Sequence, residues 1–302
     1  MLSVAKKKSK PVSPWAELQR SVTQSWDERK SLIEKIQKHY NSKVVTFFAT
    51  FRSLDAEISD DDAETLESIL SHECDGSALT LIINSPGGQG MAAERIANVC
   101  RKYSCNQFDV IVPHMAKSAA TMVCFGARKI LMSSTAELGP VDPQVTYIDD
   151  HQKPHWISAA EYVRAYENLI SNATSTEAAR IEPYIQQLAR YDSRRIEQLK
   201  SAQQLSEDIS VSLLKTGMMS GKTDDEIKKS IDVFLTQQRT SSHGRMINLS
   251  GAQACGLSME EIPLQSEVWK WIWKLFLSSD WVVMRGKALK LMETDETGLT
   301  MA

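Results

Sequence analysis

The chain of 302 residues lacks several features that mark particular classes of protein. No apolar run approaches the roughly 20 residues that span a bilayer, so no integral membrane segment is predicted. The five cysteines are odd in number and scattered without a CxxC pair, which indicates neither a disulfide framework nor a zinc site. A formal net charge of −3 gives no electrostatic reason to expect nucleic acid as a partner. We expect a cytoplasmic protein with reduced thiols and with no cofactor or metal.

The two ends of the chain differ in character from its middle. Residues 1–13 are rich in lysine without a following apolar stretch, which predicts a flexible basic tail and not a secretory signal. Residues 14–265 are expected to form one domain, since 42% hydrophobic residues provide ample core. Residues 266–302 are expected to be a helical extension rich in tryptophan. Its residues Trp269, Trp271 and Trp273 have a spacing that cannot place them all on one helix face.

Short apolar runs alternate with helical patterns along the first half of the chain. Strands are expected at 44–51, 79–84, 110–113 and 129–133, and helices at 14–40, after Ser59, at 90–102 and at 118–126. This alternation predicts an α/β fold with a mostly parallel sheet flanked by helices. Residues 158–238 are mostly helical and polar, which favours an insertion or an assembly surface.

Two strand-to-helix junctions carry the groups that acyl transfer needs. In the first, the strand 79–84 runs into Ser85-Pro86-Gly87-Gly88, whose glycines offer backbone N–H groups unshielded by a side chain. In the second, Ser118 stands among small residues at the start of a helix. Active sites of parallel sheets lie beyond the carboxyl ends of the strands, where both junctions fall. Together they predict an oxyanion cradle and a nucleophile.

These segments resemble a known group of proteins. Ser-Pro-Gly-Gly before an alanine-rich helix, together with residues 116–122 and 126–132, is similar to the ClpP/crotonase superfamily peptidases. The segment 138–144, Leu-Gly-Pro-Val-Asp-Pro-Gln, resembles most closely the serine dehydrogenase proteinase family, a branch related to signal peptide peptidase A and the Clp proteolytic subunit. Residues 244–257 are similar to a C-terminal segment that these peptidases share. The resemblance implies a ClpP/crotonase-like fold.

The same resemblance implies a serine endopeptidase that hydrolyses unfolded or extended polypeptide through an acyl-enzyme on Ser118. The backbone N–H groups of Gly87 or Gly88 and of Ala119 would hold the oxyanion. Assembly into a homo-oligomer is expected, because the superfamily hides its sites inside rings or stacked trimers. The chain has no GxxxxGK[ST] motif, so any unfolding motor would be a separate chain.

The sequence leaves the general base open. The Clp subunit has a histidine on the strand after the nucleophile helix, where this chain has Asp142, a residue as suited to capping a turn as to orienting a base. The signal peptide peptidase branch has a lysine just before the next helix, and Lys153 and His155 are the nearest candidates here. His114 and Lys117 adjoin the serine in sequence, but their direction does not follow from it.

Two other functions compete with the peptidase hypothesis. Without a working base, the same fold would act as an inactive oligomeric scaffold or a peptide-binding protein. A crotonase-type acyl-CoA enzyme ranks third, because the glycine run that binds the nucleotide is absent around Ser118. Detection of turnover separates the first two hypotheses.

Overall fold

The computed structural model describes residues 26–148, 154–175, 180–236, 246–285 and 288–301. Its centre is a seven-stranded sheet of order β11-β10-β1-β2-β3-β5-β9. The strands are β1 (Lys43–Ala49), β2 (Leu79–Asn84), β3 (Phe108–Val112), β5 (Ile130–Met132), β9 (Met259–Glu261), β10 (Lys290–Glu293) and β11 (Gly298–Met301). Strands β1, β2, β3, β5 and β9 run parallel, whereas β10 and β11 pair antiparallel. The predicted α/β fold with a mostly parallel sheet is therefore confirmed.

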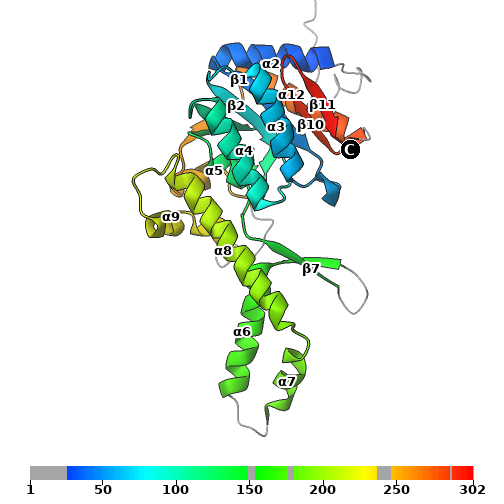
Figure 1. Cartoon of the computed structure of the whole chain (residues 1–302), viewed down its shortest axis with the longest axis vertical. Helices are drawn as coiled ribbons and strands as arrows, with labels where there is room; N and C mark the ends of the chain where they lie inside the picture. Colours follow the sequence, from blue (N-terminus) through cyan, green and yellow to red (C-terminus); the bar gives the residue numbers. More distant parts are fainter. Residues whose placement is uncertain (1–25, 149–153, 176–179, 237–245, 286–287, 302) are drawn as a thin grey trace, which may run out of the picture.

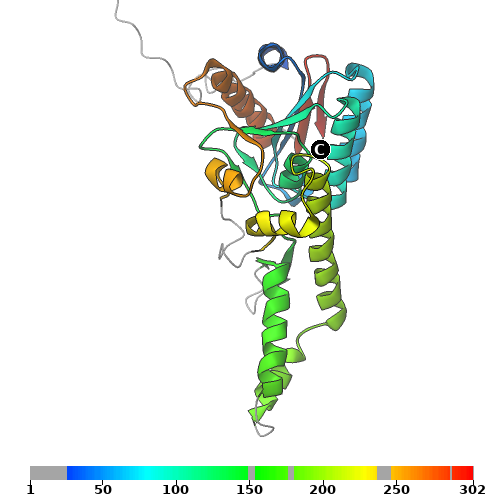
Figure 2. The ribbon, with the colours of Figure 1, turned by 90° about the vertical axis from the view of Figure 1, so that its left-hand side faces the viewer.

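Helices cover both faces of this sheet (Figures 1 and 2). The first face carries α3 (Asp60–Glu73), α4 (Gly90–Tyr103) and α5 (Ala119–Phe125), and the second carries α2 (Trp26–Tyr40) and α12 (Glu267–Arg285). Successive strand residues enter opposite cores: Phe47 belongs to the first and Phe48 to the second. Because side chains alternate along a strand, burial on both faces produces the continuous apolar runs seen in the sequence.

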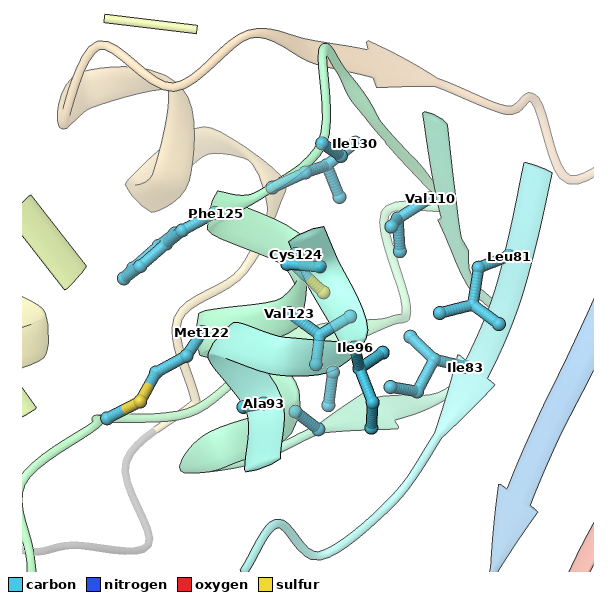
Figure 3. Close-up of a cluster of buried hydrophobic side chains, with 14 of the residues drawn as sticks. Leu81, Ile83, Ala93, Ile96, Val110, Met122, Val123, Cys124, Phe125 and Ile130 are labelled. Carbon is cyan, nitrogen blue, oxygen red and sulfur yellow. The ribbon is translucent and has the colours of Figure 1, made fainter. Parts of the chain in front are cut away.

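The short helix α5 lies inside the molecule. All seven of its residues are buried. Figure 3 shows Val123 and Cys124 of this helix gathered with Leu81 and Ile83 of β2 and with Ile96 of α4. Each buried aliphatic side chain of this size contributes about 1.5–3 kcal/mol to stability. The helix that follows Ser118 is thus anchored by packing, which determines where its first turn lies.

A helical arm projects from this body (Figure 1). It consists of α6 (Ala159–Ser175), α7 (Glu182–Leu188) and the first half of α8 (Ser193–Lys215). The hairpin of β7 (Gln144–Ile148) and β8 (Pro154–Ser158) leaves the body near the base of this arm. The second half of α8 returns to the core, where Ile209 and Leu213 are buried. The helices expected within residues 158–238 also include α9 (Asp224–Ser230) and α10 (Asp232–Leu235).

Shorter elements connect these layers. They are η1 (Leu54–Ala56), a small parallel sheet of β4 (Met115–Ala116) and β6 (Glu137–Leu138), and α11 (Leu249–Ala254). No helix in the described ranges is both long enough and apolar enough to cross a bilayer. The expected basic tail, residues 1–13, lies outside the described residues, and so does the first part of the helix expected at 14–40.

The C-terminal end differs from the expectation of a helical extension over 266–302. Helix α12 ends at Arg285, and the chain then adds β10 and β11 to the main sheet. Strand β10 pairs with β1, with Leu291 opposite Phe48. It is four residues long and has a charged residue at each end, Lys290 and Glu293. Such a segment lacks the apolar run or the alternation that identifies a strand in a sequence.

Both of these terminal charges are buried beside a partner. Arg29 of α2 donates two hydrogen bonds to the Glu293 carboxylate, at 2.7 and 2.6 Å. Lys290 donates to Asp62 of α3 at 2.8 Å. Exposed fractions of 6% for the Arg29 side chain and 1% for that of Glu293 place this pair out of water. The C-terminal strand is therefore bound to helices on both faces of the sheet.

We predict that Glu293→Gln lowers the free energy of unfolding by about 3–5 kcal/mol, because it removes the negative charge of a buried ion pair with the Arg29 guanidinium. Urea unfolding followed by circular dichroism measures the change. Asp192→Asn is the matched control, since it removes an exposed pair with Arg194 and should cost about 1 kcal/mol or less. Equal effects of the two substitutions would contradict the assigned role of the buried pair.

Candidate active site

Ser118 joins β4 to α5 with a backbone conformation that residues with a side chain rarely adopt. Its φ is 49° and its ψ is −122°. The surrounding chain holds this conformation: the Ser118 N–H donates to the carbonyl of Pro140 at 3.2 Å, and its own carbonyl accepts from Thr121 at 2.9 Å. Such strain costs about 1–3 kcal/mol and occurs preferentially at functional sites. The Ser118 hydroxyl is only partly buried and forms no hydrogen bond with a described residue.

The glycine turn lies against this serine. Gly87 has a φ of 103°, and a Cβ atom added to it would stand 2.5 Å from the Lys117 carbonyl oxygen and 2.7 Å from the Ser118 Cβ. A Cβ at Gly88 would collide with the backbone of Ile58. Only glycine allows these two approaches, so the Pro-Gly-Gly sequence is what brings the first junction next to the second.

The hydrogen bonds of this turn determine which N–H groups stay available. The Gly87 N–H donates to the Ser85 hydroxyl at 3.1 Å. Gly88 forms a parallel bridge with Ile58, whose N–H donates to the Gly87 carbonyl at 2.7 Å and whose carbonyl accepts from Gln89 at 2.9 Å. In such a bridge the N–H and carbonyl of Gly88 point away from Ile58. Among the described residues, neither the Gly88 N–H nor the Ala119 N–H has an acceptor.

Ser118 and the two glycines border one open cavity of about 690 Å³. Its described lining residues are Ser53, Leu54, Asp55, Glu57, Pro86, Gly87, Gly88, Ser118, Pro143 and Gln144. The predicted nucleophile and both glycines of the predicted cradle therefore share a single site. Pro143 and Gln144 belong to the segment that leads into the β7–β8 hairpin, so this hairpin begins at the edge of the cavity.

Two buried polar residues that the sequence analysis did not single out support the serine. The Thr121 hydroxyl lies 2.8 Å from the carbonyl oxygen of Ala116 and 3.0 Å from that of Gly139, which are its acceptors. The Asn84 side chain accepts from the Met115 N–H at 3.0 Å and so binds the end of β2 to β4. A hydroxyl in the first turn of an apolar helix was the signal in the sequence, since such a group needs a partner when it is buried.

Lys117 and His114 have partners of their own. The Lys117 ammonium pairs with the Glu137 carboxylate of β6. The His114 ring packs beside Phe276 of α12, with ring centroids 5.3 Å apart. Burial lowers the pKa of His114, and the negative charge of Glu137 opposes this effect in part. Neither His114 nor Lys117 is among the described residues that line the cavity.

The two candidates for the base, Lys153 and His155, and Asp142, which would orient the base, all belong to residues 142–155. Asp142 is buried, with 3% of its surface exposed, immediately before the cavity residues Pro143 and Gln144. His155 lies on β8, opposite Tyr147 in the register of the hairpin. Lys153 lies outside the described residues. The structure thus brings Ser118 together with Gly87 and Gly88 in one cavity, whereas the oxyanion role of the backbone N–H groups and the assignment of the base stay predictions.

A strained serine beside free backbone N–H groups, at the carboxyl ends of parallel strands, is the arrangement of a serine hydrolase. Residues 14–159, just under half of the chain, match the family of ClpP-like SDH-type serine proteinases. The matched segment contains both junctions and the segment 138–144. It confirms the family that the sequence motifs predict.

Two uncharacterized proteins of Methanocaldococcus jannaschii are also similar to the chain. One is 37% identical over 102 residues, which cover 34% of this chain and 34% of the relative. The other is 33% identical over 88 residues, which cover 29% of this chain and 30% of the relative. The matched segments thus span about a third of the length of these curated relatives.

We predict that Thr121→Val lowers the free energy of unfolding by about 1–3 kcal/mol, because it removes the buried hydroxyl whose single proton serves the Ala116 and Gly139 carbonyls. Thr121→Ser keeps the hydroxyl and should retain most of that stability. In a peptidase assay Thr121→Val should also lower kcat by about tenfold or more with little change in KM, since small displacements of a nucleophile slow the reaction strongly. Urea unfolding and steady-state kinetics test both effects, and equal behaviour of the valine and serine variants would contradict the positioning role.

Proposed function

We propose that this protein is a serine endopeptidase that cleaves unfolded or extended polypeptide through an acyl-enzyme on Ser118. The observation that carries the proposal is the convergence, in one cavity, of the strained Ser118 with Gly88, whose N–H group has no acceptor among the described residues. The Ala119 N–H, which directly follows Ser118, has no described acceptor either. The match of residues 14–159 to a family of serine proteinases supports the proposal. The cysteines, none of which is in a disulfide, support a reducing compartment and hence the cytoplasm.

In the proposed reaction the Ser118 oxygen attacks the carbonyl carbon of the scissile bond. The negative charge that develops on the carbonyl oxygen is stabilised by the N–H groups of Gly88 and Ala119, each of which lowers the barrier by about 3–4 kcal/mol. A base accepts the serine proton and passes it to the leaving amine, which departs and leaves the acyl-enzyme. Water then hydrolyses the ester by the same steps in reverse, which restores the serine.

We propose that the base belongs to the β7–β8 segment. This segment starts at the edge of the cavity with Gln144. Its second strand carries His155, two residues after Lys153 in the sequence. A lysine would need burial to lower its pKa enough to accept the proton, whereas a histidine needs less adjustment. Asp142, which precedes the segment, would orient the base.

The edge of the glycine turn also suits an extended substrate. Since Gly88 directs its own N–H and carbonyl away from Ile58, a polypeptide strand can pair with it on the free side. Main-chain hydrogen bonds of this kind give affinity without a strict sequence requirement. This supports unfolded polypeptide as the substrate class.

A second candidate is an inactive scaffold or peptide-binding protein of the same fold. It is favoured by one observation: the Ser118 hydroxyl has no hydrogen-bond partner among the described residues. Hydrogen bonds of catalytic groups are often long or absent before substrate binds, so this observation alone does not outweigh the oxyanion geometry.

We predict that the wild-type protein degrades an unfolded protein such as casein and that Ser118→Ala abolishes the activity. The matched control is Ser71→Ala, which removes an exposed hydroxyl on α3 and should leave the rate unchanged. Product release is followed by fluorescence on protein of defined oligomeric size. Equal activity of Ser118→Ala and the wild type would remove Ser118 as the nucleophile, and binding of casein without turnover would support the scaffold.

We also propose that the arm is an assembly surface of a homo-oligomer. Among the described residues its buried hydrophobic side chains are few, and Ile170 and Ile185 are 38% and 48% exposed. The buried ones are Ala159, Val163, Ala173, Ile196 and Leu199. Exposed apolar side chains on a projecting element with a small core are typical of surfaces that another subunit covers.

We predict that Ile185→Lys shifts the protein toward smaller species in analytical ultracentrifugation, because a charge would be buried in the subunit contact. Met246→Lys makes the same kind of change at an exposed site outside the arm and serves as the control. An unchanged distribution for Ile185→Lys would place the subunit contact elsewhere.

A further inference from the structure

One wall of the Ser118 cavity carries negative charge that no cation in the described part of the chain pairs with. The wall is formed by η1 and its neighbours, which contribute the exposed carboxylates Asp55 and Glu57. The Asp55 carboxylate lies beside the Ser53 hydroxyl, and Glu57 accepts from the Gln89 amide at 3.4 Å, so both neighbours are neutral. Neither carboxylate forms an ion pair with a described residue, and the described lining of the cavity contains no lysine, arginine or histidine.

The same wall offers an apolar contact. Leu54, between Ser53 and Asp55, is 73% exposed and lines the cavity. Lysine and arginine side chains have an apolar stem and a charged end. Leu54 would contact the apolar stem of such a side chain, and the carboxylates of Asp55 and Glu57 would attract its charged end. An acidic side chain would be repelled by these carboxylates, and an aliphatic one would leave them unpaired.

This wall has a fixed position relative to the oxyanion donors. Ile58, which follows Glu57, is bonded to the glycine turn on both sides: its N–H donates to Gly87 at 2.7 Å and its carbonyl accepts from Gln89 at 2.9 Å. The wall therefore stays at a fixed position relative to Gly88, where the scissile carbonyl would bind. A substrate side chain close to the scissile bond is the one that would contact the wall.

We infer that the site prefers polypeptide segments with a lysine or arginine beside the scissile bond, and that Asp55 and Glu57 determine this preference. The inference rests on the proposed peptidase function and adds the charge of its substrate. Opposite charges attract over a Debye length of about 8–10 Å at physiological ionic strength, so the preference should weaken as salt is added.

The experiment uses fluorogenic peptides in which one lysine is moved along an otherwise neutral sequence. Each peptide is compared with its acetyl-lysine form, which keeps the stem and removes the charge. At the position beside the scissile bond, we expect kcat/KM to be about tenfold higher for lysine at low ionic strength. The double variant Asp55→Asn/Glu57→Gln should abolish the difference. Asp27→Asn/Glu28→Gln removes the same charges from the exposed start of α2 and should preserve it.

Two measurements separate this inference from the proposed function. Cleavage that depends on Ser118 but shows no difference between lysine and acetyl-lysine at any position would overturn the charge preference and leave the peptidase intact. In the absence of cleavage, the dissociation constants of the same peptides for the Ser118→Ala protein are measured by fluorescence anisotropy. Tighter binding of the lysine form, lost in Asp55→Asn/Glu57→Gln, supports the inference, and equal constants overturn it.

Discussion

The approach of Gly87 to the Lys117–Ser118 peptide is the contact on which the site depends. The distance of 2.5 Å between the Lys117 carbonyl oxygen and the place where a Cβ would stand leaves no room for any other residue. It brings together two junctions that are about thirty residues apart in the chain. The bridge to Ile58 holds the backbone of Gly88 in place, so the proposed oxyanion donor would need little reorganisation when negative charge develops.

The strain at Ser118 is sustained by packing on both sides of it. The buried helix α5 anchors the chain after the serine, and the Thr121 hydroxyl joins this helix to the carbonyls of Ala116 and Gly139. Close-packed protein interiors resist local relaxation, so the serine keeps a conformation that it would leave in a free peptide. Apolar burial of a short helix therefore helps to fix the geometry of the proposed nucleophile.

The parts that the sequence predicted well are those in which a local pattern and the fold agree. Strand β2 begins and ends where its apolar run does, and both junctions follow from glycines and small residues at strand ends. Strands β10 and β11 were missed, because the charges of Lys290 and Glu293 are buried only through Asp62 and Arg29, which are distant in sequence. The carboxylates of Asp55 and Glu57 were missed for a similar reason: only the bridge between Ile58 and Gly88 brings them to the cavity.

The arm and the nucleophile are joined by a short chain of hydrogen bonds. Ser206, on α8 where this helix passes from the arm to the core, donates to the Val141 carbonyl at 2.5 Å. Val141 follows Pro140, whose carbonyl accepts the Ser118 N–H at 3.2 Å. Helix α8 thus begins in the arm, and its middle, at Ser206, is linked to Ser118 through the successive carbonyls of Val141 and Pro140. A subunit that fixes the arm would also restrict the segment that holds Ser118, and this connects assembly with the geometry that acyl transfer requires.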